Sequence, residues 1–235
     1  TERVIALDEE TGATLWTHEW QTSYRMLMVS YAIGPRATPT VDGDRVYVVG
    51  ATGRLFCLDV ATGAVFWQKD FVEEYDTSVP TWGITSAPLV DGNRLITLVG
   101  GKPDALVVAF DKHTGEEIWR AVEIVQEMGY APPIIYEAGG TRQLIIWHPG
   151  ALMSLDPVTG DALWEQPWEV GSGLSVVTPI KSNDYLFVSQ FYNGSMMDLI
   201  RLFHTLRHLR KKQILALITH RLRERFFFLF WFFCF

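Results

Sequence analysis

The thirteen residues LFCLDVATGAVFW at positions 55–67 form a phrase that returns three more times along the chain. The other copies are VIALDEETGATLW at 4–16, VVAFDKHTGEEIW at 107–119 and LMSLDPVTGDALW at 152–164. Every copy has an Asp, a Thr-Gly pair three and four residues later, and a Trp four residues after the Gly. A phrase that keeps its register over steps of 45–52 residues indicates a repeat architecture.

The phrase is the second half of a longer unit, which the sequence divides into four short strands. In 34–71, the Asp42-Gly43 pair separates two apolar runs and is a strong hairpin signal. Two further turns and two further runs complete this unit. Units with the same order follow over 88–120 and 133–165, and a fourth opens at 179. Four antiparallel strands in each 40–50 residues predict an all-β fold, a β-propeller of four-stranded blades.

Each fixed position of the phrase has a structural explanation. Asp and Thr side chains hydrogen-bond to nearby backbone groups and fix a tight turn, while Gly supplies a positive φ. The Trp ring then reaches the next blade, and its N–H finds a backbone acceptor. In a β-sandwich, the alternative, these would be ordinary core and turn residues, but the four-fold register favours the propeller. The predicted structural repeat motif consists of Asp8, Thr11, Gly12, Trp16, Asp59, Thr62, Gly63, Trp67, Asp111, Thr114, Gly115, Trp119, Asp156, Thr159, Gly160 and Trp164.

The phrase resembles the tryptophan-docking motif of the pyrroloquinoline-quinone (PQQ) repeat family, over about residues 1–197. Thr38-Pro39 before Asp42-Gly43, and Ala87-Pro88 before Asp91-Gly92, strengthen the resemblance. A WD-repeat propeller would show a Gly-His and a terminal Trp-Asp in each unit, and neither recurs. The resemblance implies one of two kinds of protein: a quinoprotein dehydrogenase or a non-catalytic propeller similar to BamB, which assists outer-membrane protein assembly.

The residues argue against the catalytic kind. Quinoprotein dehydrogenases typically carry an adjacent Cys-Cys pair over the cofactor, whereas this chain has only Cys57 and Cys234. They also hold calcium beside the quinone. Glu73, Glu74 and Asp76 lie together after the second Trp, and we interpret them as part of a solvated loop rather than a calcium site. We assign no catalytic, cofactor-binding or metal-ligating residue and no cofactor, the alternative being PQQ with calcium.

We therefore expect a non-catalytic scaffold that binds other proteins through loops on the propeller faces. The resemblance implies a periplasmic or cell-envelope location. One alternative is a fragment of a PQQ-dependent alcohol or sugar dehydrogenase, and another is a ligand- or glycan-binding accessory propeller. Fold alone does not choose among them. A formal net charge of −7 argues against a nucleic-acid partner, because a phosphate backbone attracts Lys and Arg.

Residues 198–235 differ in composition from residues 1–197. They contain eight Lys or Arg and only two acids, and they end FFFLFWFFCF. We interpret them as an aberrant, out-of-frame stretch outside the propeller. The alternatives are a basic amphipathic helix on an anionic membrane and a membrane anchor, for which the terminal apolar run is short. Residues 1–197 supply about four of the seven or eight blades of a closed ring, so we expect further blades outside this chain, including before Thr1.

Overall fold

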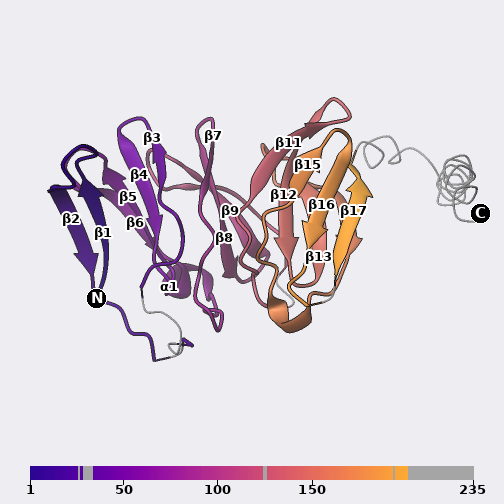
Figure 1. Ribbon diagram of the computed structural model, residues 1–235, viewed down its shortest axis with the longest axis horizontal. Coiled ribbons are helices and arrows are strands. Elements are labelled where there is room, and N and C mark those ends of the chain that lie inside the picture. The colour runs from indigo at the N-terminus through magenta and orange to yellow at the C-terminus, as the bar shows by residue number, and fades with distance from the viewer. Residues whose placement is uncertain (26, 29–33, 124–125, 193, 201–235) are drawn as a thin grey trace, which may run out of the picture.

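The computed structural model describes all residues except 26, 29–33, 124–125, 193 and 201–235. Within the described residues, seventeen strands form five antiparallel sheets that stand side by side (Figure 1). We label them sheets A to E in chain order. Strands that are neighbours in a sheet are also neighbours in sequence. The prediction of an all-β, incomplete propeller of four-stranded antiparallel blades is confirmed.

Three sheets have four strands, and the two end sheets have fewer. Sheet A contains β1 (Glu2–Leu7) and β2 (Thr14–Trp20). Sheet B contains β3 (Thr40–Asp42), β4 (Arg45–Val49), β5 (Arg54–Asp59) and β6 (Val65–Asp70). Sheet C contains β7 (Leu89–Asp91), β8 (Arg94–Gly101), β9 (Ala105–Asp111) and β10 (Glu117–Ala121). Sheet D contains β11 (Ile134–Ala138), β12 (Thr141–His148), β13 (Ala151–Leu155) and β14 (Ala162–Pro167). Sheet E contains β15 (Ile180–Ser182), β16 (Tyr185–Ser189) and β17 (Ser195–Leu199).

Two short helical segments lie in connections between sheets, at the same end of the molecule (Figure 1). The first is α1 (Phe71–Tyr75), which begins after Asp70 because that carboxylate accepts the backbone N–H groups of Val72 and Glu73. The second is the 3₁₀ turn η1 (Gly171–Gly173). We call this end the α1 end. The Asp–Thr-Gly turns of the repeated phrase lie at the opposite end, which we call the turn end.

A β-bulge interrupts each copy of the phrase just before its Trp. In sheet B, Val65 pairs with Leu58 and Trp67 pairs with Cys57, which leaves Phe66 as the extra residue. Sheets A, C and D have the same shift in register at the same place. Bulges bend a strand, increase its twist and re-aim its side chains. Here the side chain that follows the bulge is the Trp, which contacts the next sheet.

The hydrophobic core lies between neighbouring sheets. Strand β9 is buried at every position except its last, because both of its faces are covered. One cluster of buried side chains joins sheets B and C and reaches into sheet D, and a second joins sheets D and E. A third joins sheet A to sheet B, with Trp20 of sheet A beside Phe56 and Leu58 of sheet B. The sheets are therefore held together by apolar packing, as propeller blades are.

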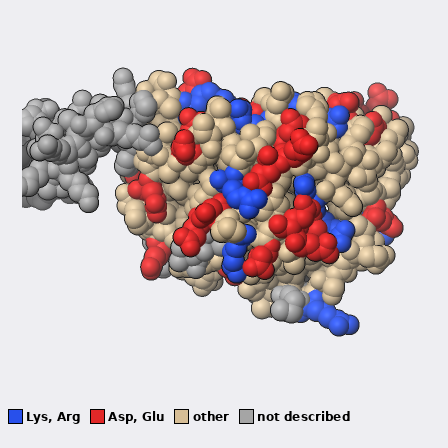
Figure 2. Space-filling model, turned by 180° about the vertical axis from the view of Figure 1, so that it is seen from behind, with Lys and Arg blue, Asp and Glu red and all other residues tan. Residues whose placement is uncertain are grey.

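Most charged side chains lie outside this core. Acidic and basic groups are interspersed over the face of the molecule shown in Figure 2. Several charged side chains of the described residues form ion pairs, for example Arg54 with Asp70 at 3.2 Å and Lys69 with Glu74 at 2.9 Å. Pairs as exposed as these contribute little to stability. On that face, basic groups are not gathered into the continuous stripe that a phosphate backbone would require.

The last described strand passes the composition boundary expected after residue 197. In β17, Asp198 pairs with Leu186 and Leu199 pairs with Tyr185 of the neighbouring strand. Ile200 is fully buried, and its N–H donates to the carbonyl of Asp184 at 3.0 Å. The three interpretations concern residues 198–235, of which 201–235 lie outside the described residues. In the described part of the chain, no helix is long and apolar enough to cross a membrane.

Candidate functional site

The Asp–Thr-Gly turns are built by one set of hydrogen bonds. Oδ1 of Asp59 accepts the backbone N–H of Thr62 at 2.7 Å and its hydroxyl at 2.8 Å. The backbone closes the same turn, because Gly63 N donates to Asp59 O at 2.8 Å and Asp59 N donates to Ala64 O at 2.8 Å. Asp8 and Thr11 repeat this arrangement, with 2.8 and 2.6 Å to the N–H and the hydroxyl.

The other two turns keep the Asp and change its partners. Oδ1 of Asp111 accepts the N–H groups of His113 at 2.8 Å and Thr114 at 3.0 Å. Oδ1 of Asp156 accepts the N–H of Val158 at 2.7 Å. In that turn the hydroxyl of Thr159 donates to Asp161 instead, at 2.9 Å. All four predicted Asp residues thus lie in turns, and their carboxylates accept local hydrogen bonds.

These hydrogen bonds lower the pKa of the carboxylates in the first three turns, those of Asp8, Asp59 and Asp111. The hydroxyl and N–H of Thr11 lower the pKa of Asp8, and those of Thr62 lower the pKa of Asp59. Burial alone would raise the pKa of Asp111, but the N–H groups of Thr114 and His113 outweigh it, so this pKa is also lowered. A carboxyl group with a lowered pKa is a poor proton donor near neutral pH. The repeated acids therefore suit turn formation rather than acid–base catalysis.

The Gly of each following turn lies under a Trp from the preceding sheet. A Cβ added to Gly63 would lie 2.6 Å from Trp16, one on Gly115 would lie 2.8 Å from Trp67, and one on Gly160 would lie 2.8 Å from Trp119. All three glycines also have φ between +71° and +79°. The Gly is therefore required twice, by the left-handed backbone and by the close approach of an indole ring.

The indole N–H groups of Trp16 and Trp67 bond across the first two of the four junctions. Nε1 of Trp16 donates to the carbonyl of Val60 at 2.9 Å, and Nε1 of Trp67 donates to the equivalent carbonyl of Lys112 at 3.2 Å. Nε1 of Trp119 is buried and has no hydrogen-bond partner among the described residues. Nε1 of Trp164 donates to Gln143 in its own sheet, at 2.7 Å.

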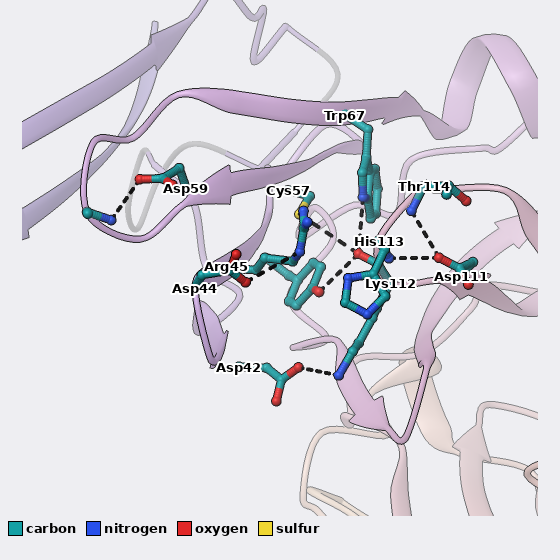
Figure 3. A network of polar contacts seen from close by, with 12 residues as sticks. Asp42, Asp44, Arg45, Cys57, Asp59, Trp67, Asp111, Lys112, His113 and Thr114 are labelled. Carbon is teal, nitrogen blue, oxygen red and sulfur yellow. Dashed lines mark hydrogen bonds and ion pairs between the residues drawn. The ribbon is translucent and has the colours of Figure 1, made fainter.

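Lys112 is the centre of the junction between sheets B and C (Figure 3). Its carbonyl accepts the hydroxyl of Tyr47 at 3.0 Å as well as the indole of Trp67, and the thiol of Cys57 approaches it at 4.0 Å. Its ammonium group pairs with Asp42 of sheet B at 2.6 Å. Burial raises the pKa of the Cys57 thiol, which therefore stays protonated and unreactive. One residue of sheet C thus contacts four residues of sheet B.

A second ion pair of the same kind joins sheets C and D. Nη2 of Arg142 lies 2.5 Å from Oδ1 of Asp91, and Nη1 of Arg142 lies 3.3 Å from Oδ2. Asp91 and Asp42 are the first residues of the two Asp-Gly hairpin turns. The sequence identified both only as turn residues. Each of them also pairs with a cation of the next sheet. The two cations, Lys112 and Arg142, occupy different positions in their repeats, so the sequence pattern did not predict these pairs.

The three acids around α1 do not fit a calcium site. The carboxylate of Glu74 is occupied by Lys69 at 2.9 Å and by the N–H of Asp70 at 2.9 Å. Asp76 lies 3.8 Å from Lys102. No group of three or more His, Cys, Asp or Glu side chains in the described part of the chain is arranged to hold a metal ion.

Sequence reasoning missed a buried carboxylate in sheet A. Glu2 is 1% exposed, and its carboxylate accepts the indole N–H of Trp20 at 2.8 Å, the hydroxyl of Tyr24, and the backbone N–H of Ala51 in sheet B at 2.9 Å. It therefore ties sheet A to sheet B. The equivalent position in sheet B, six residues before the phrase Asp, is Gly53. The sequence could have indicated this role, because Glu2 is an acid at a position where the next repeat has Gly.

Polar side chains from separate connections meet at the α1 end. The carboxylate of Glu127 accepts the hydroxyl of Tyr130 at 2.9 Å and the hydroxyl of Thr81 at 3.5 Å. Nη1 of Arg36 donates to the carbonyl of Trp82 at 2.5 Å. Burial, and then Glu127, raise the pKa of Tyr130, so its hydroxyl remains a donor. We call these five residues the connection cluster. Sequence reasoning did not find it, because the connections between sheets do not repeat.

Comparison with known proteins fits this geometry. The family model described as outer membrane protein assembly factor BamB matches residues 1–212. The chain belongs to the BamB family of PQQ-like repeat propellers. A BamB of Kangiella koreensis is 27% identical over 117 residues, which cover 50% of this chain and 26% of that protein. The crystal structure of BamB from Moraxella catarrhalis superposes with a TM-score of 0.59 at 24% identity, over 85% of this chain and 52% of that one.

This chain is also similar in sequence to quinoproteins. Quinohemoprotein alcohol dehydrogenase ADH IIB of Pseudomonas putida is 31% identical over 146 residues, which cover 60% of this chain and 21% of the enzyme. The chain thus spans about a fifth to a quarter of these two curated relatives. Both kinds of relative contain the propeller. Membership of the BamB family therefore defines the fold, whereas the biochemical role has to be argued from the residues of the site.

Proposed function

We propose that this chain is a non-catalytic propeller scaffold of the bacterial cell envelope, located in the periplasm, which binds other proteins. The observation that carries the proposal is the use of the repeated polar residues. The phrase carboxylates accept hydrogen bonds within their own turns, and Asp42 and Asp91 pair with the next sheet. Side chains used in this way hold sheets together and are not free for chemistry.

The α1 end is the proposed partner face. Loops on a rigid scaffold are where binding residues concentrate. The connection cluster offers a carboxylate, a guanidinium group and hydroxyls from separate connections, whereas the turn end consists of short turns. The family model's description, outer membrane protein assembly factor, supports protein partners and an envelope location.

Site-specific photo-crosslinking tests the partner face. A photo-reactive residue at Thr81, on the α1 end, is compared with one at Val158, which is 50% exposed on the turn end. In intact bacterial envelopes we expect protein adducts from position 81 and few from position 158. Equal labelling from both positions, or adducts only from position 158, would contradict the assignment of the face.

A fragment of a PQQ-dependent dehydrogenase is the second candidate, favoured by the 31% identity to ADH IIB. Purified protein is mixed with PQQ and calcium, then examined for quinone absorbance bound to protein and for alcohol-dependent dye reduction. We expect neither, because the acids near α1 are paired with Lys69 and Lys102. Stoichiometric PQQ binding with dye reduction would replace the scaffold proposal by the enzyme.

A further inference from the structure

Glu127 of the connection cluster is a half-buried carboxylate without a cation beside it. Asp42, Asp70 and Asp91 are also half-buried, and each forms an ion pair with a Lys or Arg side chain. Among the described residues, no Lys, Arg or His side chain forms an ion pair with Glu127. Acidic side chains that leave the solvent are usually paired. The described part of the chain therefore does not supply the counter-charge of Glu127.

The cation of the connection cluster has other partners. The guanidinium group of Arg36 donates to the carbonyl of Trp82 at 2.5 Å and to that of Met28 at 3.5 Å. Glu127 accepts hydroxyl groups instead: Oε2 accepts that of Tyr130 at 2.9 Å, and Oε1 accepts that of Thr81 at 3.5 Å. These two neutral donors orient the carboxylate and leave its negative charge uncompensated.

Backbone contacts hold this carboxylate in place. The connection that carries Glu127 crosses the connection between sheets D and E, because the N–H groups of Tyr130 and Ala131 both donate to the carbonyl of Ser175, at 3.1 and 2.8 Å. Gly173 lies against the carboxylate, since a Cβ added to this glycine would lie 3.1 Å from Oε2 of Glu127. A group that is fixed before its ligand arrives loses little entropy on binding.

A second polar group at the same crossing has unused hydrogen-bonding capacity. Oγ of Ser175 belongs to a fully buried residue and has no hydrogen-bond partner among the described residues. It lies against the backbone of Gly129, where an added Cβ would be 2.4 Å from it. A buried hydroxyl without a partner indicates a water or a ligand group that completes it. The crossing thus combines an uncompensated negative charge with an unpartnered hydroxyl.

We propose that Glu127 accepts the ammonium group of a lysine side chain from the protein that binds the α1 end. An ammonium group has three donors and no acceptor, which suits a site made of acceptors. As a point charge it needs one oxygen, and Oε1 has only the 3.5 Å bond to Thr81. A guanidinium group would pair with both carboxylate oxygens, but Oε2 already accepts Tyr130. This inference rests on the proposed function and adds the chemical group that the partner presents.

Carbodiimide coupling tests the contact directly. Bacterial envelopes that contain the full chain are treated with a water-soluble carbodiimide, which joins a carboxylate to an amine in contact with it as an amide and takes up the water that is lost. We expect mass spectrometry to find a peptide in which Glu127 is joined to a lysine of another protein. A mass increase on Glu127 from a free amine alone would overturn the assignment to a protein.

The contribution of the charge is measured by the photo-adducts formed from position 81. Glu127→Gln should lower their yield about 10-fold below saturation, because it removes one partner of an ion pair. The matched control is Glu123→Gln, an exposed acid on the same connection, which should leave the yield unchanged. Thermal melts confirm folding, and Glu127→Asp, which withdraws the carboxylate by one methylene, replaces Glu127→Gln if the latter unfolds.

The two readouts separate this inference from the proposed function. Photo-adducts that persist in Glu127→Gln, or that fall equally in Glu123→Gln, would overturn the lysine contact and leave the partner face standing. Photo-adducts without any amide at Glu127 would do the same. A wild type that gives no protein adduct from position 81 would overturn both.

Discussion

The junction between sheets B and C differs from the junction between sheets D and E. Trp67 covers Gly115 and donates to the carbonyl of Lys112, so the phrase of one sheet docks on the turn of the next. Trp164 occupies the same place in its own phrase, yet it donates to Gln143 within sheet D.

The two receiving sheets also differ in sequence. In sheet E, Leu199 occupies the position of the phrase Asp, since it pairs with Tyr185 as Asp59 pairs with Arg45. Other groups form hydrogen bonds across this junction. Tyr136 donates to the carbonyl of Pro179 at 2.9 Å, and the amide of Gln190 donates to the carbonyl of Glu169 at 3.0 Å. The junction between sheets D and E therefore uses polar side chains that do not belong to the repeated phrase.

The largest effect is expected from removing the indole at the B–C junction. Trp67→Ala should lower the free energy of unfolding by about 3–5 kcal/mol, because it leaves a cavity over Gly115 and removes a bond to Lys112. Chemical denaturation followed by tryptophan fluorescence and circular dichroism measures the change. The control is Phe66→Ala, which removes the adjacent, 45% exposed ring and should cost less. Equal losses for the two variants would show that Trp67 has no special role at the junction.

The second largest loss of stability is expected when a side chain is added to the glycine under Trp67. Gly115→Ala adds a Cβ within 2.8 Å of Trp67 at a backbone φ of +75°, and we expect a loss of about 2–4 kcal/mol from overpacking and strain together. Gly12→Ala is the matched control, with nearly the same φ and no neighbour among the described residues, so only the strain of about 1 kcal/mol should remain. Urea midpoints give both values. If the two substitutions cost the same, the indole contact does not constrain the Gly.

Replacing each Trp by Phe should sharpen the contrast between the two junctions. Trp164→Phe leaves the side-chain oxygen of Gln143, which is 1% exposed, without its donor, and should cost about 1–3 kcal/mol more than the loss of ring area. Trp67→Phe should cost about 0.5–1.5 kcal/mol, because the carbonyl of Lys112 still accepts Tyr47. The test compares both melting temperatures with that of the wild type. A greater loss for Trp67→Phe would contradict the local role of Trp164.

The smallest effect is expected on the dependence of stability on acidic pH. The pKa values of Asp8 and Asp59 are lowered in the fold, so their stabilisation is complete above the unfolded pKa of about 3.9 and is lost as the pH falls through the folded values. Urea midpoints should therefore drop as the pH falls below about 4, where these carboxylates become protonated. Asp59→Asn should show a smaller drop than the wild type. An unchanged drop would mean that other carboxylates cause the acid sensitivity.

The features that repeat could be predicted from the sequence, and those that occur once could not. The periodic phrase determined the strand order, the propeller architecture and the turns, because each copy supports the same interpretation. The roles of Glu2, the Lys112 side chain and the connection cluster depend on which residue lies opposite in space. One exception was accessible: the position held by Arg45 and Arg94 in sheets B and C is Gln143 in sheet D, an acceptor where the others are donors. That substitution explains why Trp164 bonds within its own sheet.

The placement of Trp and Gly within one phrase has an evolutionary consequence. Each repeat contains a ring that covers the next repeat and a glycine that is covered by the previous one. A duplication of one whole repeat therefore copies both halves of a junction, and the new unit fits between its neighbours without a compensating mutation. A duplication with its boundary between the Gly and the Trp of one phrase would not copy the two residues together. Propellers of this type can thus change length in whole repeats while the contact between Trp and Gly is kept at each new junction.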